Sequence, residues 1–103
     1  MIKIMNLRTA QIAYPWDVRV DRKSALGNPF YMHSEAERDR VCEQYAAYFQ
    51  QRIAKNNPGD PFIQELKRIQ QLYKQYGKLR LFCWCAPKRC HAETIRDYLI
   101  KTT

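Results

Sequence analysis

The sequence predicts an α/β fold: a small open, mostly parallel sheet flanked by helices, in the order β-β-α-α-β-α, forming a single domain over residues 1–103. Segments with strand periodicity alternate with helical segments, which is typical of a mostly parallel sheet. One strand-like segment, 78–85, is apolar on both faces, as in a sheet covered by helices on both sides. Hydrophobic residues make up 46% and charged residues 27%, values that indicate a folded globular chain.

Two short strands are expected near the N-terminus. Apolar residues recur in the segment 2–7 and predict the first strand. In the segment 16–20 apolar residues alternate with charged ones, which predicts a second, half-buried strand. A loop rich in turn-forming residues, 22–29, follows.

Two helices are expected in the middle of the chain. Ser34 and Glu37 have the spacing of a capping box, which predicts that the first helix begins at Ser34. Apolar residues then recur every four positions over 41–53 and form one buried stripe. Asp60 is a natural cap for the second helix, and Gly77 is a natural end for it.

The final strand and helix locate the candidate site. Cys83 and Cys85 share one face of the strand 78–85, and Trp84 points the other way. The last helix is expected to begin at about His91. Because ligands of open α/β sheets bind beyond the carboxyl ends of the strands, the loop after Cys85 is the expected binding place.

The start of the last helix is the expected centre of the chemistry. Its first amides have no partner within the helix and carry the positive end of the dipole, so they form an anion site to which Lys88 and Arg89 add charge. The same field favours a thiolate, so we expect Cys90 to be the reactive nucleophile. His91 is the expected general acid or base.

Alternative interpretations of these residues remain open. Cys83 is most simply a core residue on the sheet face, and Trp84 is more often a packing residue than a stacking platform. Cys83, Cys85, Cys90 and His91 would supply a permitted zinc set. The single residue between the first two cysteines and the adjacency of the last two ligands argue against zinc, so we expect no metal or cofactor, with zinc on those four residues as the alternative.

A second motif lies in the loop before the first helix. Gly27 permits backbone angles that other residues avoid, and Asn28 offers both donors and acceptors for a base edge or carboxamide. Arg22 can fork onto a phosphate or carboxylate. The alternative is an ordinary turn in which Asn28 bonds its own backbone.

The net charge and the distribution of cysteines indicate the class of partner and the cellular compartment. A net charge of +8 favours an anionic partner through long-range attraction. Four cysteines without a disulfide-like distribution, no signal-peptide pattern and no apolar run approaching about 20 residues indicate a cytoplasmic protein with no membrane partner. For a phage-encoded chain this would be the host cytoplasm.

Two stretches, Leu26-Gly27-Asn28-Pro29-Phe30 preceded by Arg22 and Cys83-Trp84-Cys85-Ala86-Pro87 with Cys90-His91, resemble a phage and bacterial family, domain of unknown function 4326. The resemblance covers most of the chain and implies a compact α/β fold that gathers both motifs at one site. The family usually carries glycine where this chain has Asp21, which makes the geometry of Arg22 less certain. The family implies no established reaction.

The expected function is the binding of a nucleotide or related phosphorylated small molecule, with phosphate at the last helix start. The sequence leaves open whether the molecule is also processed. The alternative is a basic module that binds nucleic acid or a host protein, with structural cysteines. The expected ligand-binding residues are Arg22, Gly27, Asn28, Cys83, Trp84, Cys85, Lys88 and Arg89, and the expected catalytic residues are Cys90 and His91.

Overall fold

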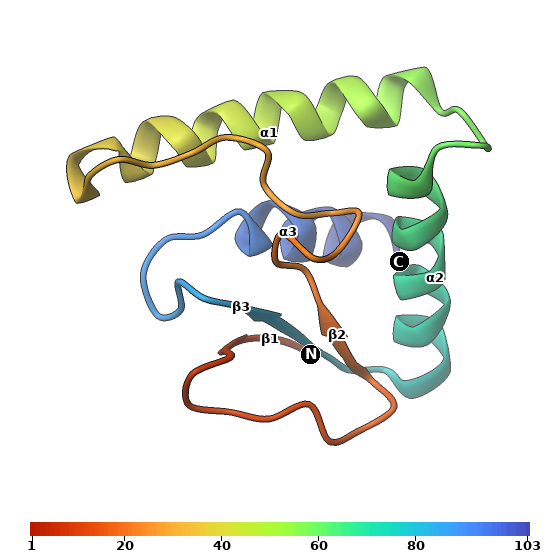
Figure 1. The fold of residues 1–103 in the computed structure, drawn as a ribbon. Helices are drawn as coiled ribbons and strands as arrows, with labels where there is room; N and C mark the ends of the chain where they lie inside the picture. Colours follow the sequence, from red (N-terminus) through yellow and green to blue (C-terminus); the bar gives the residue numbers. More distant parts are fainter.

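The computed structural model describes residues 1–103 as a three-stranded sheet with three α-helices (Figure 1). The predicted α/β class and element order are confirmed. None of the helices is both long and apolar enough to cross a membrane. The elements in chain order are β1 (Ile2–Asn6), β2 (Asp17–Arg19), the 3₁₀ turn η1 (Glu35–Glu37), α1 (Arg38–Lys55), α2 (Pro61–Tyr76), β3 (Leu79–Cys83) and α3 (Ala92–Thr102).

The sheet has the order β1-β3-β2, and both pairings are parallel. The most apolar strand, β3, takes the central position because there it is shielded on both edges. Asn6 of β1 pairs with Cys83 of β3, and Arg19 of β2 pairs with Phe82. The carboxyl ends of all three strands therefore meet at one edge, where the sequence predicts the site.

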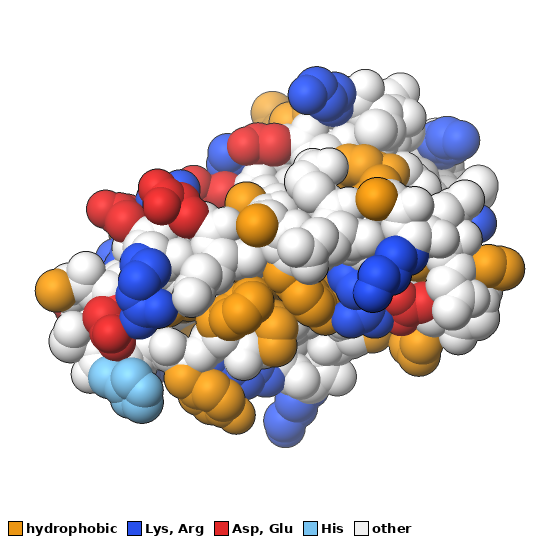
Figure 2. All heavy atoms as spheres, turned by 90° about the horizontal axis from the view of Figure 1, so that it is seen from above, with side chains coloured by type: hydrophobic (Ala, Val, Ile, Leu, Met, Phe, Trp, Pro, Cys, Tyr) orange, Lys and Arg blue, Asp and Glu red, His pale blue; other side chains and the backbone are white.

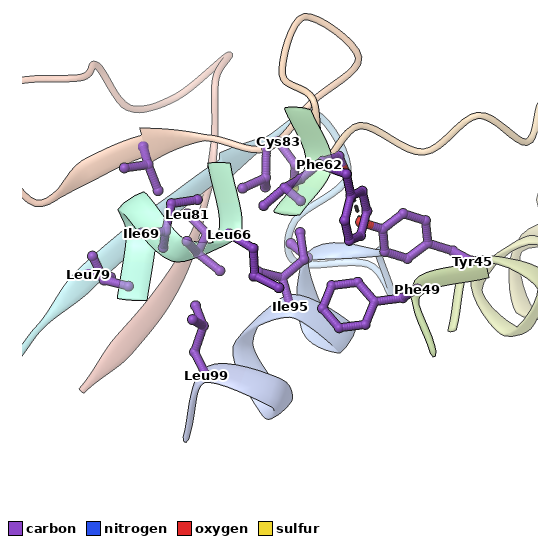
Figure 3. Packing of buried hydrophobic residues seen from close by; sticks show 14 of the residues in the cluster. Tyr45, Phe49, Phe62, Leu66, Ile69, Leu79, Leu81, Cys83, Ile95 and Leu99 are labelled. Atoms are coloured by element: carbon purple, nitrogen blue, oxygen red, sulfur yellow. Dashed lines mark hydrogen bonds between the residues drawn. The ribbon is translucent and has the colours of Figure 1, made fainter. Parts of the chain in front are cut away.

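The hydrophobic core lies between the sheet and the helices. Figure 3 shows β3 side chains meeting side chains of all three helices. Burial of this set is the main force holding the helices on the sheet, at roughly 1.5–3 kcal/mol for each large side chain. The labelled members are Leu79, Leu81 and Cys83 of β3, Tyr45 and Phe49 of α1, Phe62, Leu66 and Ile69 of α2, and Ile95 and Leu99 of α3.

The opposite face of the sheet is not covered by helices, so the expectation of helices on both faces is wrong. Phe82 is fully buried but lies outside the core cluster. On its side, the segment 7–16 runs beneath the sheet (Figure 1). Arg80 fastens this segment by donating to the Gln11 carbonyl and to the Asp17 carboxylate. An irregular loop thus covers the second apolar face of the sheet. The periodicity of a strand predicts that a face is covered, but it does not tell whether a loop or a helix covers it.

Both predicted boundaries of α2 have the expected chemistry. Asp60 caps α2 by accepting from the Phe62 amide at 3.0 Å, and Gly77 ends it with φ at +69°. At α1 the capping box is only half formed. The Ser34 side chain makes no cap bond, and Glu37 accepts instead from the His33 amide at 2.8 Å. The chain makes a 3₁₀ turn first, so the α-helix begins four residues later than predicted.

Candidate functional site

A pocket of about 230 Å³ lies at the carboxyl edge of the sheet. Its walls come from three places: the loop that contains Asn28, the first turns of α1, and the segment between β3 and α3. The two sequence motifs therefore converge on one cavity. The predicted site residues that line it are Arg22, Asn28, Cys83, Trp84, Cys85, Arg89, Cys90 and His91.

Two predicted ligand-binding residues do not line this pocket. A Cβ atom at Gly27 would lie 2.6 Å from the Cα of Arg22 and 2.6 Å from the Asp21 carbonyl oxygen, so this glycine lets two backbone segments touch. Lys88 is exposed and pairs with Glu35 at 3.3 Å. Gly27 therefore supports the loop, and Lys88 belongs to the outer surface.

Arg22 and Asn28 first stabilise their own loop. Arg22 donates from Nε to the Asn28 carbonyl and from Nη2 to the Phe30 carbonyl, both at 3.1 Å, and its guanidinium lies 4.3 Å from the centre of the Tyr31 ring. The Asn28 Oδ1 accepts from the Phe30 amide at 2.8 Å, so the turn interpretation holds for that oxygen. The Asn28 amide nitrogen makes no hydrogen bond within the chain and is available at the pocket.

Asp21 links the two motifs. Its buried carboxylate accepts from the indole Nε1 of Trp84 at 3.0 Å and from Arg19 Nε at 3.1 Å. Burial would raise the pKa of Asp21, but the hydrogen bonds from Arg19 and Trp84 outweigh it and hold the pKa below its usual value. Asp21 thus orients Trp84, and Arg22 still reaches its loop.

Three cysteine side chains meet at the floor of the pocket. Cys83 and Cys90 are buried, whereas Cys85 is partly exposed. Cys90 lies close enough to Cys83 and Cys85 to lower the pKa of both neighbouring thiols. Together with the Arg38 guanidinium, Cys90 lowers the pKa of Cys85 to about 6 despite its partial burial. Cys90 has only one proton to donate, so it cannot stabilise a thiolate at both neighbours at once. Arg38 lies beside Cys85 and therefore favours Cys85 as the charged member of the cluster.

The expectation of a stabilised thiolate at Cys90 is wrong in this structure. The amide of Ala92 does point at its sulfur, as a helix start should. The interactions with Cys83 and Cys85 favour the protonated form of Cys90, and burial does the same. Together they outweigh the effect of the Ala92 amide and raise the pKa of Cys90. The thiol best placed to react at neutral pH is Cys85, and the catalytic role assigned to Cys90 stays a prediction.

His91 is a buried neutral imidazole. Its Nε2 faces the Val20 carbonyl, which can only accept, so Nε2 carries the ring proton. Its Nδ1 then presents a lone pair to the Cys90 sulfur, 3.4 Å away. Burial lowers the pKa of His91, which keeps the ring neutral near pH 7. The Nδ1 atom of His91 therefore faces Cys90 as an acceptor, and the general acid or base role assigned to His91 stays a prediction.

The amides at the start of α3 are already used within the chain. The Ala92 amide points at the Cys90 sulfur, the Glu93 amide donates to the Cys90 carbonyl at 3.0 Å, and the Thr94 amide donates to the His91 carbonyl at 3.0 Å. The placement of phosphate on this helix start therefore stays a prediction. Positive charge reaches the pocket through side chains instead.

Arg38 and Asn6 are site residues that sequence reasoning missed. Arg38 lines the pocket, pairs with Glu35 at 2.8 Å and donates to the Arg89 carbonyl at 2.9 Å. Asn6 donates to the Ala86 carbonyl at 2.8 Å and thereby holds the cysteine segment in place. A polar residue ending β1 was a usable signal for Asn6, whereas Arg38 resembles any charged residue in a first helical turn.

The zinc alternative receives no support from this geometry. No group of three or more His, Cys, Asp or Glu side chains is arranged to hold a metal ion. One nitrogen of His91 is committed to Val20, and the other faces Cys90.

The fold and the site together define a small α/β domain with a pocket of thiols and arginines at the carboxyl edge of a parallel sheet. The chain belongs to the family described as Domain of unknown function (DUF4326), whose model matches residues 5–101. The family resemblance of the sequence is thereby confirmed. No curated protein and no solved structure matches the chain.

Proposed function

We propose that the pocket binds an anionic small molecule of the nucleotide class, a planar head group carrying phosphate. The observation that carries the proposal is the convergence of three arginines, an available carboxamide and aromatic side chains on one cavity at the carboxyl edge of a parallel sheet. Such edges are the usual binding place in open α/β folds.

The charge at the pocket favours an anion. Arg22, Arg38 and Arg89 line it, and each keeps donors beyond those used within the chain. The buried carboxylate, Asp21, is neutralised by Arg19 and does not repel a ligand. A guanidinium can hold a phosphate through two parallel hydrogen bonds, which suits Arg22 and Arg89 at the exposed rim.

The size of the cavity limits what it encloses. Its volume of about 230 Å³ lies below the range of roughly 300–1,000 Å³ for typical small-molecule sites. A base or a sugar fits inside, whereas the phosphates of a whole nucleotide would remain at the rim. We therefore expect a monophosphate to bind as well as a triphosphate.

Recognition of the head group falls to Asn28, Trp84 and Tyr31. The unused amide nitrogen of Asn28 can donate to a carbonyl or ring nitrogen of a base. Trp84 and Tyr31 are exposed aromatic side chains on the pocket wall, available to flank a ring. In any covalent step, Cys85 would be the nucleophile, because it is the most accessible thiol of the cluster and the one beside Arg38.

The face of the molecule above α1 lacks the feature expected of a surface that binds a long polyanion. Figure 2 shows the face above α1, where Lys and Arg side chains alternate with Asp and Glu, and hydrophobic side chains gather in the middle. A surface that binds long nucleic acid usually presents a one-signed basic stripe. This face does not.

Isothermal titration of the purified protein with nucleoside monophosphates and inorganic phosphate tests the proposal. We expect micromolar affinity for at least one monophosphate, a loss of about tenfold or more, roughly 1.4 kcal/mol, in Asn28→Ala and Arg22→Ala, and only a modest dependence on salt. Arg68→Ala is the matched control, because Arg68 pairs with Glu65 on α2 and does not line the pocket.

Two results would contradict the proposal. One is equal affinity in Asn28→Ala and Arg68→Ala. The other is binding only to long DNA or RNA with a steep loss at higher salt, which marks the release of many counterions and would support the basic-module alternative.

A further inference from the structure

We propose that Cys85 and Cys90 form a redox-active thiol pair, in which Cys85 attacks a hydroperoxide and Cys90 then closes a reversible disulfide. This proposal does not depend on the ligand proposed above, because binding of that ligand does not require a reactive pair of thiols.

The geometry places an accessible thiol next to a buried one. Cys85 lies at the pocket wall and is partly exposed, so a small oxidant reaches it through the cavity. Cys90 is only 3% exposed, lines the same pocket and lies close enough to the Cys85 thiol to lower its pKa. An attacking thiol that oxidants can reach and a resolving thiol that they cannot are the arrangement that directs oxidation to a disulfide.

The surroundings divide the roles between the two cysteines. Arg38 and the Cys90 proton both favour the thiolate at Cys85, and the thiolate is the form that attacks peroxide. Cys90 keeps its proton, and the Nδ1 lone pair of His91 lies 3.4 Å from its sulfur, ready to accept that proton when Cys90 attacks. The neutral state of His91 therefore has a use in the second step.

The reaction balances with hydrogen peroxide as the oxidant. The Cys85 thiolate attacks one peroxide oxygen, the O–O bond breaks, and hydroxide leaves and takes a proton from solvent, which yields a sulfenic acid and water. The Cys90 sulfur then attacks the Cys85 sulfur, the S–O bond breaks, and the proton of Cys90 leaves with the hydroxyl as a second water. Two thiols are oxidised by two electrons, and peroxide is reduced.

The other two cysteines are less suited to these roles. Cys83 is 1% exposed, and the backbone amides of Cys85 and Ala86 point at its sulfur, which fixes the side chain at the strand end. Cys42 also lines the pocket, but burial raises its pKa and no thiol is hydrogen-bonded to it. Cys42 therefore serves as the matched control.

The test treats the folded, ligand-free protein with equimolar hydrogen peroxide and maps the products by peptide mass spectrometry. We expect a Cys85–Cys90 disulfide, loss of two of the four free thiols, and full recovery with dithiothreitol. In Cys90→Ser the sulfenic acid should persist and be trapped by dimedone at Cys85. Cys42→Ser should behave as the wild type.

Several outcomes would overturn the inference. These are a disulfide that includes Cys42 or Cys83 in the wild type, stable sulfenic acid at Cys85 while Cys90 is intact, or similar slow oxidation of all four thiols. Unchanged thermal melting of Cys90→Ser shows that the variant is folded; where it melts early, trapping in the wild type at the shortest reaction times replaces it. Because no nucleotide is present, failure here leaves the ligand titration untouched.

Discussion

The acidity of Cys85 gives the sharpest quantitative expectation. The ordinary pKa of a cysteine thiol is 9.0, whereas that of Cys85 is about 6. At pH 6 the side chain of Cys85 is therefore a thiolate in about half of the molecules. An unperturbed thiol has only about one thiolate in a thousand at that pH, which is a difference of about 500-fold. A less basic thiolate is also a weaker nucleophile, by about 20-fold over three units. At pH 6 Cys85 should therefore react about 20-fold faster with iodoacetamide than a cysteine of the unfolded chain.

The perturbation that tests the cause is a pair of variants at Cys90. Cys90→Ala removes the donor to Cys85 and should raise the pKa of Cys85, so alkylation at pH 6 slows severalfold. Cys90→Ser keeps a donor and should retain most of the rate. The assay follows alkylation of each cysteine by peptide mass spectrometry between pH 5 and pH 9. The sign is fixed by the lowered pKa: the fast reaction is present above about pH 6 and is lost as the pH falls below it.

Two observations would refute this reasoning. One is alkylation of Cys90 ahead of Cys85 at pH 6, which would restore the sequence-based expectation of a helix-start thiolate. The other is an identical pH profile in Cys90→Ala and Cys90→Ser, which would show that the neighbouring thiol does not control the acidity of Cys85.

Three further expectations concern stability, each measured by urea unfolding. Gly27→Ala should lower the free energy of unfolding by about 1–3 kcal/mol, because its methyl would meet backbone atoms at 2.6 Å, whereas Gly59→Ala, with its nearest atom at 3.5 Å, should change it by under about 0.5 kcal/mol. Asp60→Ala should cost about 1–2 kcal/mol through loss of a cap, and Ser34→Ala, which loses no cap bond, should cost under about 0.5 kcal/mol. Burial lowers the pKa of His91, so below about pH 6.5 the unfolded chain binds a proton that the folded chain does not. The free energy of unfolding should therefore fall from pH 7 to pH 5 in the wild type and fall less in His91→Gln; a parallel fall in both would exclude this role.

The sequence is most informative where one local rule decides the outcome. The Asp60 cap and the Gly77 end depend only on backbone chemistry within one turn, and both are as predicted. The convergence of the Asn28 loop with the cysteine segment was also accessible, because the carboxyl ends of parallel strands meet at one edge.

The sequence is least informative where several distant groups compete. The position of Cys90 at a helix start predicts a lowered pKa, yet contacts with two other thiols reverse the sign. Those contacts depend on how the segment 84–91 folds back, which Asn6 at the far end of the chain helps to determine. Arg38 likewise reaches the site through tertiary packing and carries no motif.

The central place of β3 has a consequence for how the site comes into being. β1 and β2 do not pair with each other, and each pairs only with β3, which is synthesised much later than both of them. Contacts between such distant segments form slowly, since a long loop must close before they contribute. During translation the N-terminal part would therefore leave the ribosome without a sheet to join. The cysteine segment arrives directly after β3, so the sheet and the cavity at its edge are completed by the same late event.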